Sequence, residues 1–125
     1  MRIHLALVVI GFSFLLVDCN SNRLDAVPDD FIGEWETSAE KYRGFNVEIT
    51  DKELIFKDRN NESPPEVYPI SKIEKDPKGE NLFIIFYETK DDLEYQFAFY
   101  YEKSEGGILR FKNQKRFKWK KVDKK

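Results

Sequence analysis

Histidine, cysteine and methionine are almost missing from this 125-residue chain, which has one of each: His4, Cys19 and Met1. All three lie within the first nineteen residues. A single cysteine excludes an internal disulfide. Ser-His-Asp and Cys-His nucleophilic systems need an imidazole base, and typical zinc sites draw on Cys and His. We therefore expect no catalytic residues, no metal site and no cofactor, and we do not expect an enzyme.

Motifs that bind phosphate or calcium are missing as well. The sequence has no Walker A loop, no GxGxxG fingerprint and no EF-hand pattern. Acidic pairs remain as candidates for catalysis, namely Asp29/Asp30 and Asp91/Asp92. Both pairs lie in polar, turn-like segments, where Asp is favoured because its side chain bonds the nearby backbone. We interpret them as solvated turn residues.

The chain also lacks an apolar run long enough to span a bilayer. Its longest run, LALVVIGFSFLLV at residues 5–17, covers roughly 20 Å as a helix, against a hydrocarbon core of about 30 Å. Arg2 precedes the run and polar residues follow it. This order is typical of a secretory signal peptide, predicted here as residues 1–18. A buried core helix and a short uncleaved anchor are the alternatives.

Cys19 ends the tetrapeptide LVDC, which resembles a bacterial lipobox. Leu16 and Cys19 match that motif, whereas Asp18 replaces its usual Gly, Ala or Ser. The resemblance implies that Cys19 becomes the N-terminus of a lipoprotein and carries a diacylglyceryl thioether and an N-acyl chain such as palmitate. Several acyl chains anchor a protein to a membrane stably. Cleavage after Ser21 is the alternative, and it gives a secreted, soluble protein.

The segment 19–28 is polar, ends in Pro28 and has no periodicity, so we expect a tether between the lipid and a folded domain. The expected location is the cell envelope, with the protein lipid-anchored at the outer membrane and facing either the periplasm or the exterior.

Residues 29–122 form the predicted domain, and residues 123–125 form a tail. Apolar and polar side chains alternate in short runs bounded by turn residues, which is typical of half-buried strands. The eight predicted strands are residues 31–37, 43–50, 52–58, 66–76, 81–89, 93–102, 107–113 and 114–122. Most connectors are short, so consecutive strands are antiparallel neighbours. The predicted fold class is all-β, with one small up-and-down antiparallel barrel.

Basic residues are concentrated at the end of the chain. Residues 101–125 hold ten Lys or Arg and three Asp or Glu. If the last strand pairs with the first, Arg116, Lys118 and Lys120 face Glu34 and Glu36, and opposite charges across strands are favourable. The other interpretation is a patch for anionic headgroups or another acidic partner. We expect no nucleic acid partner for an exported protein whose net charge is −2.

The first predicted strand carries a recognisable motif. FIGEWETS, with Gly33 and Trp35 on the first strand of an eight-strand chain, resembles the G-x-W start of lipocalins and the wider calycin group. The resemblance implies a barrel in which Trp35 seals one end and a late basic residue, Arg110 or Arg116, packs over its ring.

Whether the barrel interior is filled decides between two functions. Large rings are expected to face inward at Phe45, Phe56, Phe86, Tyr95, Phe97, Phe99, Phe111, Phe117 and Trp119. One hypothesis is a pocket for a small apolar ligand, and its candidate lining residues are Trp35, Tyr95, Phe97, Phe99 and Trp119. The other is a solid barrel that acts as a non-catalytic interaction protein, an inhibitor or adhesin that docks an envelope or host protein.

Overall fold

The computed structural model describes residues 22–60, 62–78 and 81–122. The predicted signal peptide, Cys19 and the tail at 123–125 lie outside the described residues. The strands are β1 Gly33–Thr37, β2 Phe45–Ile49, β3 Glu53–Asp58, β4 Glu66–Lys75, β5 Leu82–Glu88, β6 Glu94–Glu102, β7 Ile108–Phe111 and β8 Trp119–Lys121. The helices are single 3₁₀ turns: η1 Asp29–Phe31, η2 Glu40–Tyr42 and η3 Ser104–Gly106.

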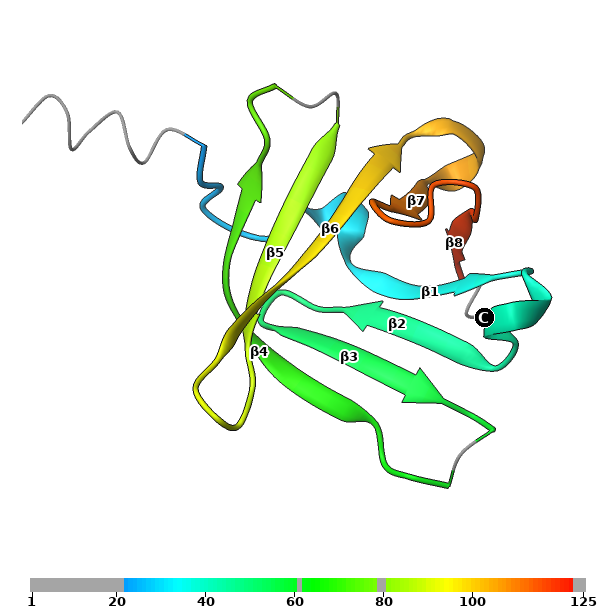
Figure 1. The fold of residues 1–125 in the computed structure, drawn as a ribbon. Helices are drawn as coiled ribbons and strands as arrows, with labels where there is room; N and C mark the ends of the chain where they lie inside the picture. The colour runs from blue at the N-terminus through cyan, green and yellow to red at the C-terminus, as the bar shows by residue number, and fades with distance from the viewer. Residues whose placement is uncertain (1–21, 61, 79–80, 123–125) are drawn as a thin grey trace, which may run out of the picture.

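These strands form a closed antiparallel barrel (Figure 1). Each strand pairs with the next one, and β8 closes the barrel by pairing with β1. The predicted all-β, eight-stranded, up-and-down barrel is therefore confirmed. The last strand is shorter than the predicted run 114–122, because residues 114–117 form turns, with Phe117 N donating to Gln114 O at 3.1 Å.

The two ends of the barrel are covered by different elements. At the end where β1 begins, which we call the closed end, η1 places Phe31 across the barrel. Its ring packs edge-on against Phe83, Phe99 and Tyr101, with centroids 4.7–5.2 Å apart. At the other end, which we call the open end, lie η2 and the loop residues 59–60, 62–65, 89–93 and 112–118.

The segment before η1 is held against the barrel. Leu24 N donates to Ile73 O at 2.9 Å, and Lys75 N donates to Asn22 O at 3.1 Å, so this segment pairs with the end of β4. Val27 is buried in the core. The predicted tether 19–28 is thus docked from Asn22 onward, because it contains apolar side chains that the barrel buries.

Candidate functional site

The interior of the closed end is packed around Trp35, although a surface cleft of about 430 Å³, lined in part by Phe31, Phe83 and Tyr101, opens beside η1. Trp35 is fully buried, and its indole Nε1 donates to Phe31 O at 3.0 Å. Phe99 is fully buried beside it, and Phe31 is 2 % exposed. A large indole whose N–H has a partner both fills this end and fixes the turn of η1 against β1.

Lys121 is the basic residue that covers Trp35. Its Nζ lies 5.5 Å from the ring centroid, and Lys121 is opposite Trp35 in the β1–β8 register. The expectation that Arg110 or Arg116 plays this part is wrong. Arg110 bonds Glu102, and Arg116 lies over Phe117. The cation comes from β8 because that strand borders β1.

Gly33 explains the first position of the G-x-W motif. Its φ is +147°, a conformation that favours glycine. A Cβ atom here would lie 3.3 Å from Lys121 Cε, which is tighter than ordinary contact. The missing side chain therefore leaves room for the Lys121 stem beside Gly33, with its Nζ over the Trp35 ring.

The open end is lined by aromatic rings that are only half-buried. These rings form a chain of contacts, with centroids 4.6–6.4 Å apart, around the mouth of the barrel. The half-buried members are Tyr42, Phe45, Phe56, Tyr68, Tyr87, Phe97, Phe111 and Phe117. We call this set, together with the buried Trp119 beneath it, the aromatic mouth. Rings in this state present apolar area to a ligand without needing the core to open.

Trp119 differs from the other tryptophan. It is fully buried and contacts Phe111 in a stacked arrangement at 4.6 Å, with Tyr42 and Phe45 at 5.5 and 6.3 Å. Its Nε1 has no hydrogen-bond acceptor among the described residues. Buried donors without a partner are uncommon in folded proteins. The aromatic mouth therefore holds one unused hydrogen-bond donor at its base.

Three of the five predicted pocket residues, Phe97, Phe99 and Trp119, are connected through ring contacts. The rings of Phe99, Phe97, Phe111 and Trp119 form a continuous chain from the middle of the barrel to the mouth. Tyr95 lies at the rim, 48 % exposed, and contacts Tyr87 at 6.0 Å. Trp35 lies at the closed end, buried beneath η1.

Phe86 does not face inward as predicted. It is opposite Lys72 and Gln96 in the sheet, so it shares their outer face, and Lys72 Nζ covers its ring at 4.6 Å. β5 is apolar on both faces, so alternation alone does not tell which face is inside.

Three mouth residues were missed at the sequence level: Tyr42, Tyr68 and Tyr87. Tyr42 lies in η2, outside any strand. Tyr68 is in a run interrupted by Pro69, and Tyr87 is in the strand that is apolar on both faces. For Tyr68, the usable signal was the alternation along β4, because Tyr68 pairs with Leu54 and therefore shares its face of the sheet.

Among the clefts beside the mouth, two share Phe45. One, of about 200 Å³, is lined by Lys41, Tyr42, Arg43, Phe45, Asp58 and Asn60. The other, of about 210 Å³, is lined by Phe45, Phe56, Asp58, Ser63, Pro64 and Glu66. Phe45 and Asp58 line both clefts, so the two clefts adjoin at these residues.

Two tyrosine hydroxyls at the mouth have raised pKa values. Burial, and then the hydrogen bond to Glu66 at 3.1 Å, raises the pKa of Tyr68. Burial raises the pKa of Tyr87 as well. Both hydroxyls stay protonated at neutral pH and offer neutral hydrogen-bonding groups at the rim.

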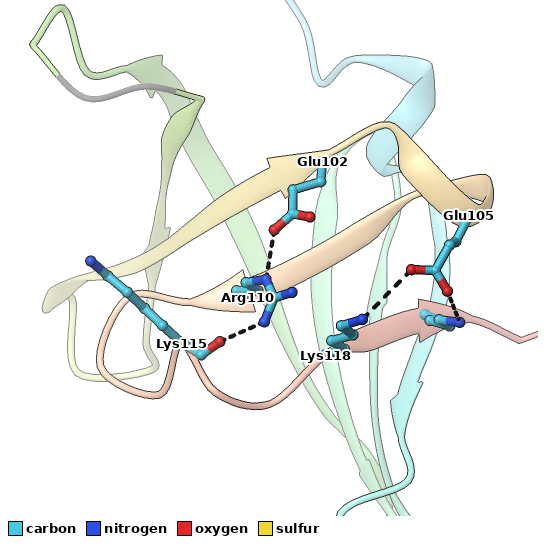
Figure 2. A network of polar contacts seen from close by, with 6 residues as sticks. Glu102, Glu105, Arg110, Lys115 and Lys118 are labelled. Carbon is cyan, nitrogen blue, oxygen red and sulfur yellow. Dashed lines mark hydrogen bonds and ion pairs between the residues drawn. The ribbon is translucent and has the colours of Figure 1, made fainter.

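Acidic side chains pair with several of the basic residues near the end of the chain (Figure 2). Lys120 Nζ donates to Glu105 at 2.9 Å, and Lys118 Nζ lies 3.6 Å from the same carboxylate. The hydrogen bond from Lys120, followed by the charge of Lys118, lowers the pKa of Glu105. Arg110 bonds Glu102 at 2.6 Å and the Lys115 carbonyl at 2.8 Å.

The charge matching predicted between the first and last strands is present only in part. Lys120 lies opposite Glu36 in the register, but its side chain bonds Glu105. Glu34 is buried on the outer face, where it accepts a hydrogen bond from Asn46 Nδ2 at 2.6 Å and lies 3.6 Å from Lys57 Nζ. Lys57 also bonds Glu48 at 2.7 Å, and this bond contributes most to its raised pKa.

Within the described residues, no group of three or more His, Cys, Asp or Glu is placed to hold a metal ion. The helices described are single 3₁₀ turns, and none has the length and apolar character needed to cross a bilayer. Comparisons with protein-family models, with curated proteins and with solved structures found no match for this chain.

Proposed function

We propose that this protein is a lipid-anchored lipoprotein of the cell envelope whose lipocalin-like barrel binds a small apolar ligand in the aromatic mouth. The observation that carries the proposal is the set of half-buried aromatic rings that line the open end. When an apolar molecule covers half-exposed rings in a barrel mouth, their apolar surface is removed from water, which is favourable. We assign the protein no catalytic activity.

The anchoring part of the proposal rests on Cys19 and on the docked segment that follows it. Three residue steps separate Cys19 from Asn22, and an extended chain covers at most about 3.6 Å per residue. A lipid on Cys19 therefore holds Asn22 within roughly 11 Å of the membrane surface. Because Asn22 is paired with β4, the barrel itself lies close to the bilayer.

Detergent phase partitioning tests the anchor. The wild-type protein is expected in the detergent phase, and Cys19→Ser is expected in the aqueous phase, while both are exported. A Ser21→Ala variant is the matched control and should partition like the wild type. If Cys19→Ser still enters the detergent phase, lipid on Cys19 does not hold the protein at the membrane.

Ligand binding is tested on the chain 20–125, which contains the whole described core from Val27 to Trp119. We expect a retained molecule in its native mass spectrum, or saturable uptake of a hydrophobic fluorescent dye. Phe97→Gln, in the mouth, should weaken dye binding about tenfold, because a polar amide replaces a half-buried aromatic ring. Tyr100→Gln, on the outer face of the same strand, should not. Equal binding by both variants contradicts a site in the mouth.

A second candidate function is a non-catalytic interaction protein of the inhibitor or adhesin type. It is favoured by Leu93 and Tyr95, which are 51 % and 48 % exposed at the tip of the β5–β6 hairpin. Exposed apolar side chains of this kind are typical of protein contacts when they gather in one place. Absence of any retained ligand or dye uptake in the wild-type chain favours this function over ligand binding.

A further inference from the structure

The unpaired indole N–H of Trp119 is the starting observation. Trp119 is fully buried, and its Nε1 has no acceptor among the described residues. The other tryptophan, Trp35, has its N–H bonded to a backbone carbonyl at 3.0 Å. The fold therefore satisfies one indole and leaves the other unsatisfied. The unsatisfied one lies at the base of the aromatic mouth, where ligand binding is proposed.

The surroundings of Trp119 restrict the chemistry of an acceptor. The rings in contact with Trp119 are Phe111, Tyr42 and Phe45. A carboxylate or phosphate buried among these rings would leave its charge without a partner, which is strongly unfavourable. Asp58 lines both adjacent clefts and Glu66 lines one of them, whereas Lys41 and Arg43 line the other, where Arg43 is paired with Glu40. A neutral oxygen, such as that of a ketone, aldehyde or ester, has no such cost.

Phe45 provides the route to the indole. Its ring lines both clefts of the open end and contacts the Trp119 ring. Rotation of this half-buried side chain connects the clefts to Trp119. Tyr42 also contacts the Trp119 ring, and Phe117 packs edge-on against Tyr42 at 5.6 Å.

We propose that Trp119 Nε1–H is the ligand-anchoring donor of the aromatic mouth, and that it donates a hydrogen bond to the carbonyl oxygen of a small, neutral, mainly apolar ligand. This inference rests on the proposed function, because it names the chemistry of the molecule that the mouth binds. It sets the orientation of the ligand: the carbonyl points down toward β8, and the apolar body lies among the half-buried rings.

Two matched dyes test the inference. The first is 6-propionyl-2-dimethylaminonaphthalene, which carries a ketone, and the second is its analogue with the ketone reduced to a methylene. On the chain 20–125, the ketone dye is expected to bind roughly five- to tenfold more tightly, the value of one net neutral hydrogen bond. Trp119→Phe should abolish this preference by weakening the ketone dye alone. Tyr100→Phe, on the outer face of β6, is the control and should retain the preference, and Tyr95→Phe removes the rim hydroxyl, which is the rival donor.

Nuclear magnetic resonance gives a readout that needs no variant. The chain has two tryptophans, hence two indole N–H signals. Addition of the ketone dye should move the Trp119 proton downfield, the direction of hydrogen-bond formation, and should leave the Trp35 proton in place. The methylene analogue should produce no such downfield shift. This measurement decides the question even if Trp119→Phe fails to fold.

The outcomes separate the inference from the proposed function. If both dyes bind the wild type with equal affinity, or if Trp119→Phe keeps the ketone preference, the donor role is wrong although the mouth binds apolar molecules. Loss of the preference in Tyr95→Phe also overturns it, because the donor is then the rim hydroxyl. If neither dye binds, the proposed function fails, and the inference fails with it.

Discussion

The two tryptophans show how differently the ends of this barrel are built. Trp35, at the closed end, donates to Phe31 O and is covered by Lys121. Trp119, toward the open end, is equally buried but has an N–H without an acceptor among the described residues. Burial alone therefore does not distinguish a tryptophan that stabilises the fold from one that is proposed to bind a ligand. The difference lies in whether the polar atom of each ring has a partner.

The neighbours of the two rings follow the same division. At the closed end Phe31 and Phe99 are almost fully buried and contact each other edge-on. At the open end the rings in contact with Trp119 are half-buried, and one of them is a tyrosine, Tyr42. A packed end supplies most of the stability, whereas a mouth of half-buried rings has apolar area left for binding.

The largest expected effect comes from removing the ring that covers the closed end. Phe31→Ala should lower the free energy of unfolding by about 3–5 kcal/mol, because it leaves a cavity against three other rings. Phe117→Ala, at the mouth, should cost only about 1 kcal/mol, since its ring is half-buried. Urea denaturation of the two variants measures both values. Equal losses would contradict the division between a packed end and a binding end.

A pair of conservative substitutions compares the tryptophans directly. Trp35→Phe should lower the free energy of unfolding by about 3 kcal/mol, because it also leaves Phe31 O without its donor. Trp119→Phe should cost about 1 kcal/mol or less, because loss of an unpaired N–H offsets part of the lost packing. Denaturation in urea at neutral pH gives the difference. A Trp119→Phe variant as unstable as Trp35→Phe indicates that the Trp119 N–H already has a partner.

Alternation of apolar and polar residues was sufficient to predict the barrel. In β6 the inward side chains Phe97 and Phe99 alternate with outward ones, and the short turns leave each strand beside the next. Alternation failed in β5, where both faces are apolar, so Phe86 was placed on the wrong face. It also failed in the region before Trp119, where Lys and Phe alternate but the backbone turns.

The candidate site was less accessible to prediction. Inward aromatic residues were recognisable, but their exposure depends on how far each lies from the closed end. Tyr95 and Phe99 are on the same face of the same strand, yet Tyr95 is 48 % exposed and Phe99 is fully buried. Whether the Trp119 N–H has an acceptor depends on residues that are distant in the sequence, so no local sequence pattern indicates it. The same applies to Lys121, which reaches Trp35 only because β8 borders β1.

An intermediate effect is expected at the G-x-W motif. Gly33→Ala should lower the free energy of unfolding by roughly 1–2 kcal/mol, because φ is +147° and the new Cβ meets Lys121 Cε at 3.3 Å. Lys121→Met keeps the aliphatic stem and removes the charge over Trp35. It should lower the free energy of unfolding by about 0.5–1 kcal/mol. The double variant should lower the free energy of unfolding by less than the sum of the two single effects, because both substitutions change the same contact between residue 33 and the side chain at position 121. Full additivity, measured in a double-mutant cycle, would show that the two residues act independently.

The smallest effect should come from the ion pairs on the outer face of β8. Lys120 and Lys118 lower the pKa of the exposed Glu105, so its contribution to stability is present above the unfolded-state pKa near 4.5. It is lost as pH falls through the lower, folded-state pKa. Glu105→Gln should therefore reduce the melting temperature slightly at pH 7, and the difference from wild type should disappear in strong acid. Thermal melts of both proteins from pH 7 to pH 2, at low and high salt, measure this. A difference that persists at the lowest pH would show that the effect does not come from the charge of Glu105.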